Sequence, residues 1–294
     1  MEKIAPGSKV GIISPSSALQ DPDSISLGLD YLRSLGLTPV TGHHVFDKWR
    51  YMAGTDRNRA DDINGFFADP DIKAVFCTCG GAGSQRLLPF LDYGLIRSNP
   101  KPVFGISDAT ALQLGIYALT GNINYTGFAL KYDFKNGGVD GLVDATLRGI
   151  LSGGSVHASG GETVIGGKAE GKLVGGCLSL MCNLTGTPYF PDLTDSILLI
   201  EDVDEKTYKI DLMLSHLSQL PGFFKIKGII FGKFADTVQV DEADGSVDEV
   251  IGYFCRDLKI PVIKNFNYGH IPSRYILPVG GHVSLDADKG SVSF

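Results

Sequence analysis

The chain lacks any long apolar run. No stretch of its 294 residues approaches the length of about 20 apolar residues that a membrane-spanning helix needs. The segment Met1–Gly7 lacks the apolar core of a secretory signal peptide. We therefore expect a cytoplasmic protein with no membrane partner.

Positive charge is also scarce. Lys and Arg number 26 against 33 Asp and Glu, which gives a formal net charge of −7. A protein that binds nucleic acid needs clustered basic residues to neutralise phosphates, and no such cluster is present. The charge balance excludes nucleic acid as the expected partner and favours a small or peptidic substrate.

Cysteine and histidine lack the spacings that bind metals or build disulfide frameworks. The cysteines number 5, an odd count, and Cys77-Thr78-Cys79 is C-x-C rather than the C-x-x-C of redox and zinc sites. None of the 6 histidines makes an H-x-x-x-H or H-E-x-x-H pair. We expect reduced structural thiols, no metal and no other cofactor.

In the first half of the chain, short apolar runs alternate with segments of helical spacing. This βαβα order predicts an α/β domain with a parallel sheet covered by helices. The predicted strands are 9–13, 74–77 and 103–104, and the predicted helices are 25–35, 57–68 and 109–119.

A small, polar, glycine-rich stretch then interrupts this pattern. Its composition is typical of a linker. We predict a first domain over 1–152, a linker over 153–165 and a second domain over 166–294. In the second domain we expect strands at 196–200 and 226–231, helices near 178–184, 210–220 and 250–258, and a closing hairpin that turns at 286–290.

One serine lies at a sharp junction between a strand and a helix. The run Val103–Thr110 places Ser107 just after Gly105, in the pattern G-x-S-x-A. Such a turn exposes the hydroxyl oxygen and directs the first N–H groups of the helix at whatever binds there. Ser107 is the predicted nucleophile; a buried serine that caps the helix is the alternative.

A serine nucleophile needs a base, and the base needs an acid that orients it. His270 is the best placed histidine, because it follows a strand-like run on a turn bounded by glycine and proline. Glu201 directly follows the apolar strand 196–200, where a carboxylate needs a partner such as histidine. The alternative for Glu201 is a helix N-terminal carboxylate or a surface pair with Lys206 or Lys209.

The glycine-rich loop Cys79–Ser84 follows the strand at 74–77. It matches neither phosphate-binding fingerprint, because Arg86 occupies the last position of the spacing. Its small residues let backbone N–H groups approach a developing oxyanion, and the N–H after the nucleophile would supply a second donor. The alternative is a loop that holds a phosphate or another anion.

Several segments together resemble the LD-carboxypeptidase family of serine peptidases. This family includes the murein tetrapeptide carboxypeptidases and the microcin C immunity peptidases, and the similarity covers nearly the whole chain. It is carried by 53–56, 59–63, 80–89 (the family's G-G-Y-G-x-x-R-L-L-P), 105–112, 175–178, 186–188, 200–203 and 268–272.

The resemblance implies a Rossmann-like α/β domain that carries the nucleophile, and a mostly β C-terminal domain with helices that carries the acid and the base. It implies Ser107 as nucleophile, Glu201 as orienting acid and His270 as general base. The N–H groups of Asp108 and Gly81 would form the oxyanion hole. It also implies a homodimer.

We therefore predict a serine carboxypeptidase of peptidoglycan recycling. It would hydrolyse an L,D amide bond and release the C-terminal D-amino acid of a murein-derived tetrapeptide. Arg86 and Arg274, the basic residues nearest the motifs, are candidates for binding the terminal carboxylate. The chain departs from the family's usual Arg, Tyr and Asn at Cys79, Ala82 and Cys177, which alters the expected pocket walls.

Three other functions stay open on the sequence. A microcin C immunity-type peptidase would use the same triad on peptidyl- or aminoacyl-nucleotide conjugates, with an aromatic platform for the base. A non-catalytic module would hold an anion in the glycine loop. A plain α/β-hydrolase esterase lacks support, because G-x-S-x-G is missing. The candidates for the aromatic platform are Trp49, Tyr51, Phe128 and Phe190.

Overall fold

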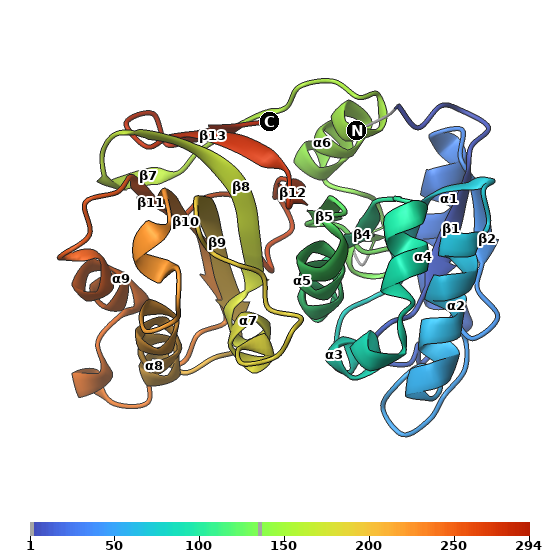
Figure 1. Cartoon of the computed structure of the whole chain (residues 1–294), viewed down its shortest axis with the longest axis horizontal. Helices are drawn as coiled ribbons and strands as arrows, with labels where there is room; N and C mark the ends of the chain where they lie inside the picture. The colour runs from blue at the N-terminus through green and yellow to red at the C-terminus, as the bar shows by residue number, and fades with distance from the viewer. Residues whose placement is uncertain (1–2, 135–136) are drawn as a thin grey trace.

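Two lobes lie side by side in the computed structural model, which describes residues 3–134 and 137–294 (Figure 1). Met1 and Glu2, part of the segment considered for a signal peptide, lie outside the described residues. The colour gradient shows that one lobe holds the amino-terminal half of the chain and the other holds most of the carboxyl-terminal half.

The first lobe is built on a six-stranded sheet in the order β12-β5-β4-β3-β1-β2. Its strands run parallel except for β12, which pairs antiparallel with β5. The near-continuous apolar sequences of β1 and β3 are typical of parallel strands that are covered on both faces. The strands are β1 (Lys9–Ile13), β2 (Thr38–Thr41), β3 (Ile72–Cys77), β4 (Val103–Gly105), β5 (Asn124–Thr126) and β12 (Leu277–Val279).

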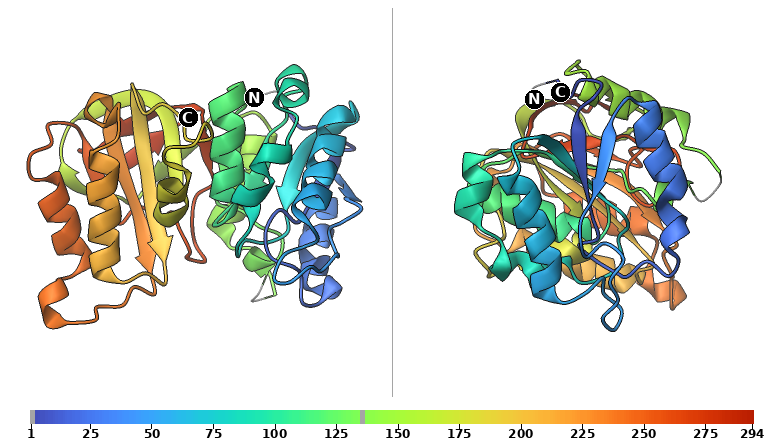
Figure 2. Two further views of the ribbon diagram at one scale, coloured as in Figure 1. Left: turned by 60° about the horizontal axis from the view of Figure 1, so that its bottom comes forward. Right: turned by 90° about the vertical axis from the view of Figure 1, so that its right-hand side faces the viewer.

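Helices connect these strands and cover the sheet (Figure 2). Helix α5 ends at Gly121, whose φ of 75° lies in the left-handed region that glycine adopts without steric cost. The α/β fold with a parallel amino-terminal sheet is thereby confirmed. The helices are η1 (Pro22–Ile25), α1 (Ser26–Ser34), α2 (Asp56–Ala68), α3 (Ser84–Leu87), η2 (Leu88–Phe90), α4 (Tyr93–Ser98), α5 (Ala109–Thr120), η3 (Tyr132–Phe134) and α6 (Gly141–Leu151).

The second lobe is built on an eight-stranded mixed sheet in the order β6-β14-β13-β8-β9-β10-β11-β7. Strands β8 to β11 run parallel, whereas β13, β14, β6 and β7 pair antiparallel with their neighbours. The strands are β6 (His157–Ser159), β7 (Glu162–Ile165), β8 (Lys168–Cys177), β9 (Ser196–Val203), β10 (Gly228–Ala235), β11 (Val262–Lys264), β13 (His282–Asp286) and β14 (Ser291–Ser293).

Alternate residues of β9 pack on opposite sides of this sheet, as the period of two in a strand dictates. Leu198 and Ile200 belong to the core that the lobe's helices cover, whereas Ile197 and Leu199 belong to a second core on the other face. The mostly β carboxyl-terminal lobe with helices is confirmed. Its helices are α7 (Leu178–Leu184), α8 (Thr207–Ser218), η4 (Phe223–Lys225), η5 (Glu242–Asp244) and α9 (Val247–Cys255).

The predicted linker over 153–165 is wrong for most of its length. Residues 157–159 and 162–165 form β6 and β7, the two edge strands of the second sheet. Only Gly160 and Gly161 separate these strands, so the sheet must curl until its edges meet. The small, polar composition reflects this tight passage between two edges rather than an unstructured connection.

The two lobes share an apolar core and a crossing strand. One cluster of buried residues joins Leu112 of α5 to Met181 of α7 and continues to Leu198 of β9. Strand β12 belongs to the predicted second domain, yet it completes the first sheet beside β5. Within the described part of the chain, no helix is long and apolar enough to cross a membrane.

Candidate active site

Ser107 lies between β4 and α5 in a constrained backbone conformation. Its φ is 67°, in the left-handed region that costs a residue other than glycine on the order of 1 kcal/mol or more. At Gly105 an added Cβ would lie 2.5 Å from the Cβ of Ala109, so the turn requires glycine there. This sharp turn leaves the Ser107 side chain partly exposed, as expected from the sequence.

The glycine loop after β3 packs directly against the nucleophile candidate. A Cβ added at Gly80 would lie 2.7 Å from Cβ and 2.9 Å from Oγ of Ser107. At Gly81, with φ 111°, an added Cβ would lie 2.1 Å from Oγ of Ser17. Both positions need glycine because the loop approaches neighbouring side chains so closely.

Asp108 connects the nucleophile turn to this loop. Its buried carboxylate accepts a hydrogen bond from the N–H of Ser84 at 2.7 Å, and its carbonyl oxygen accepts one from the Ser84 hydroxyl. Asp108 and Gly81, the predicted oxyanion donors, line one hollow of about 230 Å³. The structure thus brings the two predicted donors together beside Ser107, through contacts with Ser84 that the sequence did not reveal.

Glu201 and His270 form a hydrogen-bonded pair in the second lobe. Glu201 Oε2 lies 2.7 Å from Nδ1 of His270, and the two side chains are 0% and 10% exposed. Burial raises the pKa of Glu201, while the hydrogen bond and charge of His270 oppose that rise. The surface pair with Lys206 or Lys209, considered from the sequence, is excluded by this burial.

The backbone next to His270 is shaped to fit this carboxylate. Gly269 has a φ of 121°, and a Cβ there would lie 2.9 Å from Oε2 of Glu201. The second ring nitrogen of His270, Nε2, is buried and makes no hydrogen bond to any residue that the structure describes. Ser107 is therefore not hydrogen-bonded to His270 here; in unliganded enzymes such contacts often tighten only when substrate binds.

A hydrogen bond between the lobes places Ser107 and Glu201 in the same region. Thr110, in the first turn of α5, accepts a hydrogen bond from the N–H of Cys177 at 3.2 Å. Cys177 is the residue of β8 that stands opposite Glu201 in β9. Sequence reasoning missed Thr110, because no local pattern marks a contact between residues so far apart in the chain.

The two predicted substrate-binding arginines differ in accessibility. Arg86 lines the 230 Å³ hollow, and its Nε and Nη2 bind Asp56 at 3.0 and 2.9 Å. Arg274 is 0% exposed, and its guanidinium binds Asp133 and the carbonyl oxygens of Gly127 and Ile271. Every partner of Arg274 among the described residues is internal, which argues against its predicted contact with substrate.

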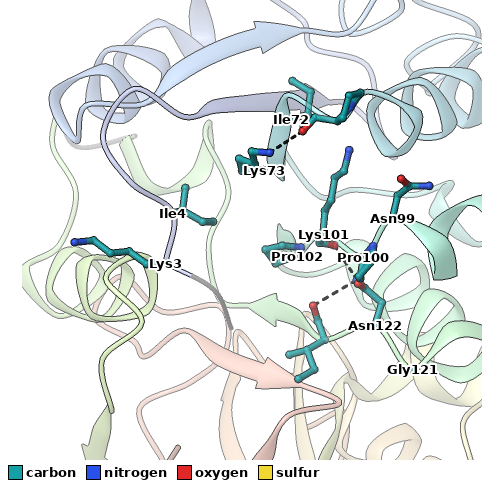
Figure 3. Close-up of a pocket in the computed structure, with 12 residues that line it drawn as sticks. Lys3, Ile4, Ile72, Lys73, Asn99, Pro100, Lys101, Pro102, Gly121 and Asn122 are labelled. Atoms are coloured by element: carbon teal, nitrogen blue, oxygen red, sulfur yellow. Dashed lines mark hydrogen bonds between the residues drawn. The ribbon is translucent and has the colours of Figure 1, made fainter.

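A larger hollow of about 640 Å³ lies at the opposite end of the strands of the first sheet (Figure 3). Its lining includes Ile72 and Pro102, at the amino-terminal ends of β3 and β4, whereas Ser107 follows the carboxyl end of β4. Lys101 also lines it, but its ammonium group binds the carbonyl oxygens of Phe66 and Asp69. This hollow is therefore separate from the candidate active site.

Over residues 3–134 and 137–294, no three His, Cys, Asp or Glu side chains gather in a way that could hold a metal ion. Of the aromatic platform candidates, Phe128 is fully buried in the first lobe, whereas Tyr51 is 54% exposed and lines the hollow beside Gly81. Tyr51 is thus the platform candidate that the structure places at the site.

Comparisons with known proteins give consistent results. A sequence profile described as the LD-carboxypeptidase N-terminal domain matches residues 10–127, and one for the C-terminal domain matches 170–285. The probable murein peptide carboxypeptidase of Bacillus subtilis is 33% identical over 292 residues, covering 97% of this chain and 91% of that protein.

Two solved structures are similar over nearly the whole chain. One is the microcin C7 self-immunity protein MccF in complex with glutamyl sulfamoyl guanosine, with a TM-score of 0.89, 29% identity, and 99% of this chain and 97% of that chain covered. The other is the muramoyltetrapeptide carboxypeptidase from Oxalobacter formigenes, with a TM-score of 0.88, 26% identity and 97% of each chain covered.

Proposed function

This chain belongs to the LD-carboxypeptidase family, and on that premise we propose that Ser107, His270 and Glu201 form its catalytic triad. The enzyme is a serine-type carboxypeptidase. The observation that carries the triad is the hydrogen bond between Glu201 and Nδ1 of His270, together with an Nε2 that bonds none of the described residues. A proton held on Nδ1 leaves the lone pair of Nε2 available, as a general base requires.

The proposed reaction proceeds through an acyl-enzyme. Ser107 Oγ forms a bond to the scissile carbonyl carbon while its proton passes to Nε2 of His270, and Glu201 stabilises the resulting imidazolium. The N–H groups of Asp108 and Gly81 bind the oxyanion. His270 then gives its proton to the nitrogen of the departing amino acid, and water hydrolyses the ester by the same proton path in reverse.

We propose that the substrate is a murein-derived tetrapeptide, and that the product released is its C-terminal D-alanine. The names of the similar proteins from B. subtilis and O. formigenes, a murein peptide and a muramoyltetrapeptide carboxypeptidase, support this choice. Arg86 is the proposed partner of the terminal carboxylate. Because Nε and Nη2 of Arg86 donate to Asp56, the Nη1 group is the donor that would bind the terminal carboxylate of the substrate.

A second candidate function has one observation in its favour. MccF has been solved with glutamyl sulfamoyl guanosine, and the exposed Tyr51 lies beside the hollow where a base could stack. On this alternative the same triad would cleave an aminoacyl-nucleotide conjugate. The two functions differ only in what occupies the pocket, so they are separated by substrate and not by mechanism.

The test is a substrate panel analysed by mass spectrometry. The wild type should release one alanine from a tetrapeptide ending in D-Ala but not from the matched peptide ending in L-Ala. The Ser107→Ala variant should lose turnover by several orders of magnitude, on the order of 10⁴-fold or more. Unchanged turnover in this variant overturns the triad, and faster cleavage of glutamyl sulfamoyl guanosine selects the second candidate.

We also propose that the enzyme acts in the cytoplasm, in peptidoglycan recycling, as a homodimer. For the domains we retain 1–152 and 166–294, with β6 and β7 assigned to the second unit. The murein names of its relatives support the process. Light scattering after gel filtration tests the dimer, and the cellular content of free tetrapeptide in a deletion strain tests the role in recycling.

A further inference from the structure

The loop that carries His270 passes from the second lobe to the first. It follows β11 and ends at β12, where Leu277 pairs with Thr126 of β5. His270 therefore lies on a segment that must be held at both lobes. The part of the first lobe that meets this loop is the segment 126–134, which begins at the last residue of β5.

Arg274 joins the loop to this segment through a fully internal set of contacts. Its Nε donates to the carbonyl oxygen of Gly127 at 3.0 Å, and its Nη2 binds Asp133 Oδ1 at 2.6 Å. Its Nη1 donates back to Ile271 of its own loop at 2.7 Å. The second oxygen of Asp133 accepts the N–H of Ala129 at 2.8 Å, so both partners of this ion pair are fixed within the protein.

Tyr132 adds a direct contact to the histidine itself. Its hydroxyl donates to the carbonyl oxygen of His270 at 3.1 Å, and its ring meets the imidazole edge-on at 84°. The guanidinium carbon of Arg274 lies 5.1 Å from the centre of the Tyr132 ring. We name Arg274, Asp133 and Tyr132 the Arg274 cluster. Tyr132 holds His270 directly from the first lobe, and Asp133 holds its loop through Arg274.

A buried ion pair is a poor source of stability, because the cost of removing two charges from water offsets their attraction. Apolar residues of similar size often serve as well or better for folding. The pair instead fixes the relative position of two segments. The planar guanidinium of Arg274 bonds Gly127, Ile271 and Asp133 at once, which no apolar residue could reproduce. This points to a geometric role.

We propose that Arg274 and Asp133 are positioning residues, which fix Nε2 of His270 relative to Ser107 across the boundary between the lobes. The proposal rests on the proposed triad. Ser107 and the 126–134 segment belong to the first lobe, whereas Glu201 belongs to the second, so the Arg274 cluster ties the base to the lobe of the nucleophile. An error of about 1 Å in such a distance can cost about 100-fold in rate.

The decisive variant is the double substitution Arg274→Met with Asp133→Leu. It removes both buried charges together, so neither charge is left without its opposite and the fold should survive, although Gly127, Ile271 and Ala129 lose a hydrogen-bond partner. We expect kcat to fall about 100-fold while KM changes little. Inactivation by a fluorophosphonate, which needs His270 but no peptide, should slow by the same factor. Arg274→Lys keeps the charge but loses the fork, so its kcat should lie between wild type and double variant.

The matched control is Arg148→Met, which removes an ion pair with Asp144 on α6, remote from His270, and should leave kcat unchanged. If the double variant folds with normal kcat and normal fluorophosphonate reactivity, the positioning role is overturned while the triad stands. A wild type that fails to react with the fluorophosphonate overturns the triad itself. If the double variant does not fold, Tyr132→Phe decides: an unchanged kcat and fluorophosphonate rate overturn the role, and a several-fold fall in both supports it.

Discussion

In the amino-terminal lobe the backbone positions Ser107, whereas in the carboxyl-terminal lobe side chains position His270 and Glu201. Ser107 is held by its own positive φ and by glycines at 80 and 105 that allow close approach. His270 is held by the hydrogen bond that its Nδ1 donates to Glu201 and by the one that its carbonyl oxygen accepts from Tyr132. The first half of the site should therefore respond to added volume, and the second half to lost charge or lost hydrogen bonds.

The largest expected effect tests the second half through its charge. Glu201→Gln keeps the size of the side chain but cannot hold the imidazole in the same tautomer or stabilise the imidazolium. We expect kcat to fall about 10⁴-fold, as the equivalent change does in other serine triads. The rate of D-alanine release measures it. The control is Glu205→Gln, a partly buried carboxylate beyond the strand that pairs with Lys209 at 3.8 Å.

The same variant should be more stable, which separates a functional charge from a structural one. Burial raises the pKa of Glu201 above its ordinary value of 4.5. The folded protein therefore holds this proton more tightly than the unfolded chain, and the ionised group costs stability as pH rises. The gain in free energy of unfolding of Glu201→Gln over the wild type should be absent below pH 4.5 and should grow as the pH rises above it. A lower melting temperature at pH 7 would contradict this.

The next largest effect is expected when the volume of a side chain beside Ser107, in the first half of the site, is increased. Gly80→Ala would place a methyl group 2.9 Å from Oγ of Ser107, so the hydroxyl must move. We expect kcat to fall about 100-fold. Stability should fall as well, because the added Cβ would lie 2.7 Å from Cβ of Ser107. Gly65→Ala is the control, because its Cβ meets nothing within 4 Å and alanine favours the helix. Equal activity in both variants would mean that Ser107 tolerates displacement.

A smaller effect is expected where the two halves meet. Thr110→Val leaves the N–H of Cys177 buried without its acceptor, which costs about 1–3 kcal/mol of stability. It also loosens α5 against β8, so we expect a roughly tenfold lower kcat with KM unchanged. Thr110→Ser keeps the hydroxyl and should restore both values. Failure of serine to restore kcat would show that packing, and not the hydrogen bond, matters here.

The sequence predicted the first half of the site more completely than the second. The order from Gly105 to the start of α5 is local, so strand, turn, serine and helix could all be predicted from contiguous residues. The exits of two strands also pointed to Glu201 and His270. Their pairing depended on the relation of β9 to a distant loop. The residues suggested a histidine as one possible partner of Glu201, the family resemblance favoured His270, and the structure shows the contact.

What the sequence could not predict depends on topology. Strand β12 enters the first sheet, and this brings Arg274 beside Asp133 rather than to the surface. An arginine near a motif has the same local sequence whether it faces solvent or a buried carboxylate. In the same way, the stretch 153–165 has the composition of a linker, although its residues 157–159 and 162–165 form two edge strands.

The smallest effect is expected at the cysteines, of which Cys79 and Cys177 lie next to the two halves of the site. Burial raises the pKa of Cys79, beside the glycine loop, and of Cys177, beside Glu201; it also raises the pKa of Cys182 and Cys255 to about 12. Only a thiolate reacts rapidly with alkylating agents. Iodoacetamide at neutral pH should therefore leave the rate of D-alanine release unchanged. The denatured protein is the control and should react at all 5 thiols. Rapid inactivation that substrate prevents would mean that a cysteine lies in the substrate pocket. Cys79 and Cys177, which stand where the family usually has other residues, would then take part in substrate binding.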